Sequence, residues 1–206
     1  MSAFPRSLLA LNLLLLTGAG FAQSPDSGEV ILGTDRSSPI TLQHFSQAEA
    51  DIDVDGLMDE AIWSRVNASE EMRVIVPDTL DAISHNTDVR VFYTDRGIYF
   101  GFDMEQPADT LVQRISTRDN LSLNRDKVGL TIDTSGEGLF GYWMMLALGD
   151  NQLDGTVLPE RQYNSDWDGA WYGGTSVTDK GWSAEFFIPW GQMALLYLLP
   201  LTMEQV

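Results

Sequence analysis

The chain has no cysteine, and only two lysines and two histidines occur among its 206 residues. The missing cysteine excludes disulfide bonds, a lipid-modified N-terminal cysteine and a cysteine nucleophile. Thirty acidic residues outnumber twelve basic ones, and the formal net charge is −18. A chain of this charge repels phosphate backbones and anionic lipid surfaces. We therefore expect no nucleic-acid partner, and we expect most of the acids to lie on solvated surface.

Motifs of the common catalytic sites are also missing. The sequence has no Gly-x-Ser-x-Gly element and no glycine-rich phosphate loop with a lysine, and His44 and His85 are isolated. Glycoside hydrolysis needs two carboxylates that face each other across the scissile bond. With thirty acids a pair can always be drawn, so the count has no diagnostic value. We expect no catalytic residues and no intrinsic enzymatic activity.

The N-terminus has the layout of a secretory signal peptide. Arg6 precedes an apolar run over residues 8–16, and Gly20 and Ala22 supply small residues for a cleavage site. The run is too short to span a bilayer comfortably. We predict that residues 1–22 are removed and that the remaining 184 residues act in the periplasm, at the outer membrane or outside the cell. The alternative is an uncleaved N-terminal anchor.

The rest of the chain is typical of a single all-β domain, an antiparallel, jelly-roll-like β-sandwich. Residues 23–50 are a polar N-terminal arm with one expected edge strand at 30–32. Alternating apolar residues and turns such as Asp95-Arg96-Gly97 indicate the sandwich over residues 51–190. Strands are predicted at residues 87–94, 98–104, 128–132, 140–148, 153–158, 171–178 and 182–188.

The segment 52–63 allows two interpretations. A short helix is predicted near residues 57–66, with Asp55 at its N-cap, Asp59 and Glu60 near its positive N-terminal end, and Asp53 facing solvent. The same acids could instead surround a structural calcium ion, which accepts six to eight oxygens from flexible loops. The candidate calcium ligands are Asp53, Asp55, Asp59 and Glu60.

Aromatic residues in a loop-like stretch are the candidate saccharide platform, because a sugar ring stacks its C–H face on a flat aromatic surface. Trp167, Trp171 and Tyr172 follow or flank acidic and glycine residues there, whereas Trp63, Trp143 and Trp182 have the phase of core residues. The alternative is that the loop tryptophans pack inward as anchors. The candidate hydroxyl partners, which could also be an ordinary polar loop, are Arg118, Asn120, Asn124 and Arg125.

Residues 191–206 form an unusual tail with an uncharged apolar run at 194–201. A stable domain seldom exposes such a run. It either continues into further sequence or is an out-of-frame tail, and both interpretations imply an incomplete product.

Four elements, in this order and spacing, resemble the carbohydrate-binding module family 9-like domain. They are Asp55–Trp63, Thr87–Tyr93 with Ile98–Gly101, Asp126–Val128 with Thr131–Asp133, and Gly181–Pro189. The resemblance covers most of the mature chain. Asp166-Trp167-Asp168 strengthens the similarity to bacterial secreted proteins in which such a domain precedes a C-terminal region of outer-membrane barrel type.

The resemblance implies a β-sandwich, structural calcium, and binding of a polysaccharide or oligosaccharide in carbohydrate catabolism. It also explains how a hydrolase activity on O-glycosyl compounds could be assigned by association, since these modules are often attached to glycosidases. Leu123 stands where sugar-binding members have a tryptophan, so their two-ring clamp is not evident here. Three hypotheses remain: a secreted carbohydrate-binding module, a structural or docking domain of an outer-membrane barrel protein, and, weakest, a glycosidase.

Overall fold

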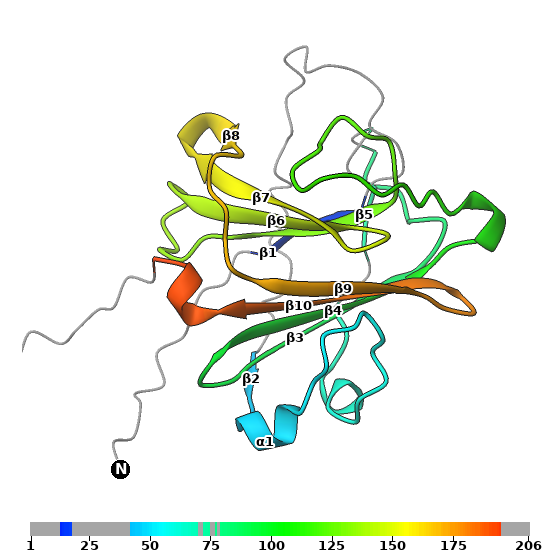
Figure 1. The fold of residues 1–206 in the computed structure, drawn as a ribbon, viewed down its shortest axis with the longest axis horizontal. Helices are drawn as coiled ribbons and strands as arrows, with labels where there is room; N and C mark the ends of the chain where they lie inside the picture. The colour runs from blue at the N-terminus through cyan, green and yellow to red at the C-terminus, as the bar shows by residue number, and fades with distance from the viewer. Residues whose placement is uncertain (1–12, 18–41, 70–71, 75–76, 78, 195–206) are drawn as a thin grey trace, which may run out of the picture.

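Two five-stranded sheets pack face to face in the computed structural model, which describes residues 13–17, 42–69, 72–74, 77 and 79–194 (Figure 1). The first sheet has the order β1 (Leu13–Thr17), β5 (Lys127–Ile132), β6 (Gly141–Ala147), β7 (Asn151–Leu158) and β8 (Gln162–Asn164). The second has the order β2 (Gln43–His44), β3 (Thr87–Tyr93), β4 (Gly97–Glu105), β10 (Gly181–Pro189) and β9 (Tyr172–Val177). Neighbouring strands are antiparallel except β2 and β3. The predicted all-β sandwich is confirmed.

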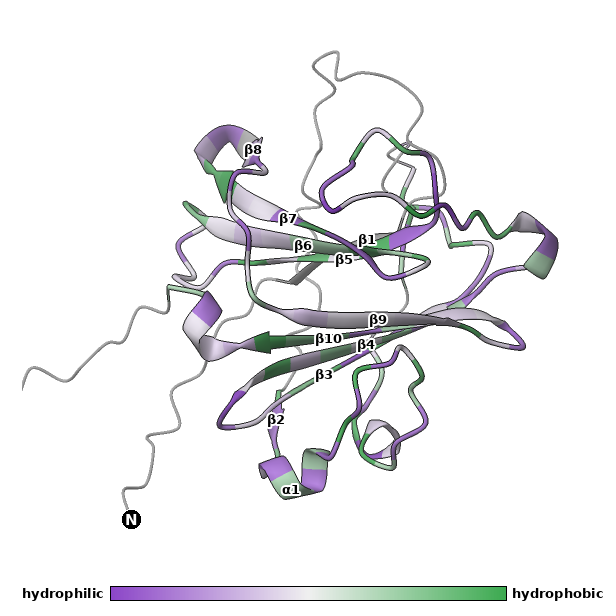
Figure 2. Ribbon diagram, viewed as in Figure 1, coloured by the Kyte–Doolittle hydropathy of each residue, from purple (hydrophilic) through white to green (hydrophobic). Residues whose placement is uncertain are grey.

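Both long hairpins of the second sheet form where the sequence alternates. The amide of Thr94 donates to the Gly97 carbonyl at 2.9 Å, and the amide of Thr178 donates to the Gly181 carbonyl at 2.9 Å. Figure 2 shows hydrophilic residues in these two turns and hydrophobic stretches along β4 and β10. The two turns therefore fix how the strands of each hairpin pair. This pairing places the apolar residues of one face of each strand between the two sheets.

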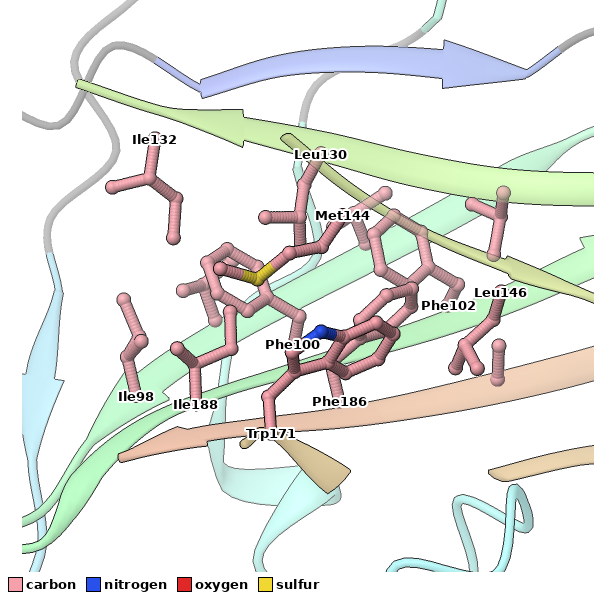
Figure 3. Packing of buried hydrophobic residues seen from close by; sticks show 14 of the residues in the cluster. Ile98, Phe100, Phe102, Leu130, Ile132, Met144, Leu146, Trp171, Phe186 and Ile188 are labelled. Atoms are coloured by element: carbon pink, nitrogen blue, oxygen red, sulfur yellow. The ribbon is translucent and has the colours of Figure 1, made fainter. Parts of the chain in front are cut away.

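The main core lies between the two sheets. Phe100, Phe102 and Phe186 are fully buried there, together with Met144 and Leu146 from the first sheet (Figure 3). A second apolar cluster covers the outer face of the second sheet, where Phe92 contacts Trp63 with ring centroids 5.2 Å apart. The three tryptophans predicted to be core residues, Trp63, Trp143 and Trp182, are each 2–3% exposed. That prediction is confirmed.

The helix expected near residues 57–66 is much shorter in the structure. Only the 3₁₀ turn η1 (Trp63–Arg65) is helical there, because Gly56 has a φ of +90° and the Asp55 carboxylate accepts from the nearby Leu57 amide, at 2.8 Å, instead of capping a helix. The single α-helix of the described residues is α1 (Gln47–Ala50), which begins with a capping box. Three further 3₁₀ turns are η2 (Ala108–Thr110), η3 (Pro159–Arg161) and η4 (Trp190–Gln192).

The segment from α1 through residue 66 lies on the face of the second sheet that is turned away from the first (Figure 1). Residues 42–50, assigned to the polar arm from the sequence, thus include β2 and α1 of the sandwich. At one edge of the first sheet, β1 pairs with β5. β1 lies within residues 1–22, the predicted signal peptide, and removal of that peptide stays a prediction. The strand expected at 30–32 and the run at 195–201 lie outside the described residues.

Within the part of the chain that the structure describes, no helix is long and apolar enough to cross a membrane.

Candidate functional site

A groove of about 530 Å³ runs along the outer face of the second sheet to the edge of the sandwich. Three aromatic residues from neighbouring strands lie along it, Tyr99, Phe187 and Tyr172, of which only Tyr172 is exposed. One wall is the segment 52–54, which crosses the sheet after α1. The groove therefore depends on two parts of the chain that lie far apart in the sequence.

The aromatic rings along the groove form a nearly parallel stack. The Tyr172 and Phe187 centroids lie 5.9 Å apart with planes at 18°, and Phe187 stacks on Tyr99 at 4.5 Å. Phe187 and Tyr99 are buried, whereas Tyr172 is 60% exposed. The guanidinium of Arg96 lies 5.6 Å from the Phe187 centroid. Tyr172 thus has an exposed apolar ring whose orientation is fixed by stacking on its cross-strand neighbour Phe187, and Phe187 in turn lies under the Arg96 cation.

Polar side chains of mixed type line the groove. The Gln47 amide donates to the Tyr99 hydroxyl at 3.2 Å and accepts from the Thr94 hydroxyl at 3.2 Å. Asp53 adds an exposed carboxylate, and Gln152 adds an amide at the sandwich edge. Together these groups can donate to and accept from hydroxyl groups, which is what recognition of a neutral polyol requires.

A buried carboxylate, Glu185, fixes the wall of the groove onto β10. It is 1% exposed and accepts from the amides of Asp55 and Gly56 at 3.2 and 3.0 Å and from the Trp63 indole at 2.8 Å. Burial, and then repulsion from Glu60, raises the pKa of Glu185 to about 8. Burial also raises the pKa of Glu60, whose Oε2 atom is buried without a hydrogen-bond partner.

At the sandwich edge, Arg118 connects β7 to the loop before β9. It bonds Asp154 at 2.7 Å, Asp168 at 2.9 Å and the Gln152 amide oxygen at 2.6 Å. Asp119, Asp154 and Asp168 have carboxylate oxygens within 4.8 Å of one another. Burial raises the pKa of Asp119; the hydrogen bond from the Asp154 amide and the charge of Arg118 oppose this, while the charge of Asp154 adds to it. Arg118 is therefore the positive charge that holds this acidic cluster together.

The residues predicted to bind saccharide separate into exposed and buried ones. Tyr172 is exposed in the groove, as the platform hypothesis requires, while Arg118 reaches the groove only through Gln152. Trp171 is 4% exposed and its ring stacks on Phe186 at 5.4 Å. The expectation that Trp171 is an exposed platform is therefore corrected, because its ring packs on Phe186 and its indole nitrogen donates to Asp154.

The other candidate partners lie away from the groove. Arg125 is 2% exposed and donates to the Arg114 carbonyl and to Asn151, so it organises its own loop and is not open to a ligand. Trp167 is half-buried with its ring 4.8 Å from that of Tyr142. Asn124 is exposed, and Asn120 is half-buried in the same loop as Arg125. No shared surface brings these side chains together with Tyr172.

The four candidate calcium ligands have separate roles in the structure. Glu60 accepts from the Asp53 amide at 3.0 Å, and Asp55 accepts from the Leu57 amide at 2.8 Å, while Asp59 is exposed. Among the described residues, Asp119, Asp154 and Asp168 are the acids close enough to share an ion. Calcium at Asp53, Asp55, Asp59 and Glu60 stays a prediction.

Sequence reasoning missed Gln47, Arg96 and Phe187, which complete the groove. Arg96 is part of the turn between β3 and β4, and its position gave no sign that it would lie over an aromatic ring. Phe187 had a detectable signal, since it alternates with the inward-facing Phe186 and Ile188 and must face outward. An outward phenylalanine on a strand indicates a covered or ligand-binding face.

No family model matches the sequence, and a search of curated proteins finds no match. Among solved structures, the chain is similar to a carbohydrate-binding module family 9 domain from Caldicellulosiruptor kristjanssonii in complex with cellotriose. The TM-score is 0.50 with 12% identity over 72% of this chain and 67% of that one. A family 9 module of the same organism in complex with glucose gives a TM-score of 0.43 with 15% identity, over 71% of this chain and 69% of that one. The first likeness shows the fold, which is a family 9-like β-sandwich.

Proposed function

We propose that this protein is a non-catalytic carbohydrate-binding module and that the groove over Tyr99, Phe187 and Tyr172 is its saccharide site. The observation that carries the proposal is the exposed Tyr172 ring, held parallel to Phe187 in a groove with amide, guanidinium and carboxylate groups around it. A tyrosine that is 60% exposed yet fixed by stacking loses little conformational freedom when a ligand binds.

A neutral saccharide fits this groove better than other ligand classes. The C–H face of a pyranose packs on an aromatic ring, and its hydroxyls need both donors and acceptors. The carboxylate of Asp53 and the net charge of −18 disfavour phosphorylated or acidic ligands. Cellotriose, the ligand of one structural neighbour, is a suitable first probe, beside oligosaccharides of other linkages.

The signal-peptide pattern supports export as part of this proposal, with the module acting in polysaccharide breakdown outside the cytoplasm. In that setting it would hold an attached region against its polysaccharide. The second candidate is a docking domain of an outer-membrane barrel protein, which Leu123, in place of a sugar-binding tryptophan, favours. Absence of saccharide binding by the folded protein would favour this second function.

Replacing Tyr172 with alanine is expected to weaken cellotriose binding by about 10- to 100-fold, because a central aromatic contact contributes roughly 1.4–2.8 kcal/mol. Isothermal titration calorimetry measures the change. The fold should remain intact, since Tyr172 is 60% exposed and lies at the start of an edge strand.

Tyr163→Ala is the matched control, because Tyr163 is also an exposed tyrosine, 48% accessible, on the edge strand β8 of the other sheet. Unchanged affinity in this variant together with a large loss in Tyr172→Ala supports the groove. Equal affinities in the wild-type protein and in Tyr172→Ala would show that saccharide binds elsewhere.

A further inference from the structure

Asp154 is a fully buried carboxylate on β7, and both of its oxygens are occupied. Oδ1 accepts from Nη2 and Nε of Arg118 at 2.7 and 3.2 Å. Oδ2 accepts from the Gly169 amide at 2.6 Å and from the Trp171 indole at 3.1 Å. A buried charge with this many donors is stable only while the surrounding groups keep their positions. Asp154 therefore holds the loop before β9 in place, and Arg118 together with the donors of that loop holds Asp154 in place.

The same network reaches the saccharide groove. Arg118 donates to the Gly169 carbonyl at 3.0 Å and to the Gln152 amide oxygen at 2.6 Å. Gln152 in turn donates to the Trp171 carbonyl at 3.2 Å. Gln152 and Trp171 both line the groove, and Tyr172 is the next residue along the chain. Two side chains, Asp154 and Arg118, thus determine where the backbone enters β9.

We propose that Asp154, acting through Arg118 and the 169–171 backbone, is a positioning residue of the groove that sets the Tyr172 platform and holds Gln152 in the wall of the groove. The inference rests on the proposed saccharide function, and Asp154 itself does not touch the ligand. The charge of Asp154 serves recognition because an error in the position of residue 171 moves the Tyr172 ring relative to Phe187. The polar groups around the groove would then no longer match the sugar hydroxyls.

Asp154→Asn keeps the shape of the side chain and one acceptor, but it removes the charge that pairs with Arg118. We expect this variant to bind cellotriose about tenfold more weakly than the wild-type protein, at a temperature where circular dichroism shows both folded. Asp109→Asn, an exposed aspartate in η2, is the control, and its affinity should not change.

A double-mutant cycle with Tyr172→Ala separates positioning from general structural damage. If Asp154 acts through Tyr172, Asp154→Asn weakens binding in the wild-type background but changes it less than about twofold in the Tyr172→Ala background. An equal loss in both backgrounds would overturn the inference, because Asp154 would then act independently of the platform. Wild-type affinity in Asp154→Asn would also overturn it, while leaving the saccharide function intact.

Arg118→Lys is the second variant, and it serves if Asp154→Asn does not fold. Lysine keeps the charge of Arg118 but has a single donor nitrogen, whereas Arg118 reaches Asp154, Gly169 and Gln152 from the separate nitrogens of a rigid planar fork. The same tenfold loss and the same dependence on Tyr172 are expected. If the wild-type protein binds no saccharide, the proposed function fails first. If it binds and these variants bind equally well, only the positioning role of Asp154 fails.

Discussion

The wild-type protein is expected to lose on the order of 3 kcal/mol of unfolding free energy between about pH 5.5 and pH 8.5, and Glu185→Gln should remove most of that loss. The cause is the buried carboxyl of Glu185 on β10, whose pKa rises to about 8 through burial and then through repulsion from Glu60. A proton on Glu185 relieves both effects. Above pH 8 the folded protein must instead keep a buried negative charge beside another acid.

The direction follows from proton binding. Between the unfolded value near 4.5 and the folded value near 8, the folded state binds a proton that the unfolded state has lost. Stability therefore falls as the pH rises, by at most about 1.4 kcal/mol per pH unit, and the contribution is complete only below pH 4.5. Ordinary carboxyls are already ionised in this range, so they add little to the slope.

Urea unfolding at several pH values measures this dependence for the wild-type protein and Glu185→Gln. The variant should be less stable at pH 5.5, because glutamine cannot accept from Trp63 and from the Asp55 and Gly56 amides in the same way. Its curve should be flatter and approach the wild-type curve near pH 8.5. Glu137→Gln, an exposed acid in the turn before β6, should keep the wild-type slope. Parallel curves for wild type and Glu185→Gln would exclude Glu185 as the source.

The second large effect is expected in the main core. Phe186→Ala should lower the free energy of unfolding by about 3–5 kcal/mol, because it removes a fully buried ring and leaves a cavity. The lost contacts include Phe102 in an edge-to-face pair at 5.4 Å and Trp171 in a stacked pair at 5.4 Å (Figure 3). Loss of the Trp171 contact should also loosen the loop that carries Tyr172.

Chemical denaturation at one pH measures the change for Phe186→Ala. Val177→Ala, at the exposed end of β9, should cost less than about 1 kcal/mol, since Val177 is 56% exposed. A loss below about 1.5 kcal/mol for Phe186→Ala would mean that the site collapses easily and that the sheets are not closely packed there.

Strand-level structure was predictable because alternation and turn chemistry agree with the final packing. The residues of β4 and β10 that face the core, including Phe100, Phe102 and Trp182, were assigned from period-two patterns alone. Tyr172 and Trp171 show where this reasoning ends. Tyr172 pairs with Phe187 in the register of β9 and β10 and so faces outward. Trp171 precedes Tyr172 and so faces the core, but an interpretation of the stretch as a loop platform overlooked this alternation.

The groove was not predictable, because its parts come together only through tertiary packing. Alternation places Glu185 on the face opposite Phe186, which an isolated sheet would expose to solvent. The segment from α1 through residue 66 covers that face, so Glu185 is buried and Gln47 of α1 lies beside Tyr99. The helix expected near residues 57–66 fails for a related reason. Its acids and Gly56 bond to their neighbours and to β10, and this replaces helical hydrogen bonds.

Chemical-shift mapping of the isotopically labelled wild-type protein during titration with cellotriose tests the saccharide groove most directly. The largest shifts are expected at Tyr172 and at the amide and guanidinium groups of Gln47 and Arg96, with Tyr163 unchanged. Saturable shifts at these residues would establish both the activity and its place. Shifts confined to the loop before β5 that carries Asn124 and the loop before β9 around Trp167, or no shifts with any oligosaccharide in folded protein, would contradict the account.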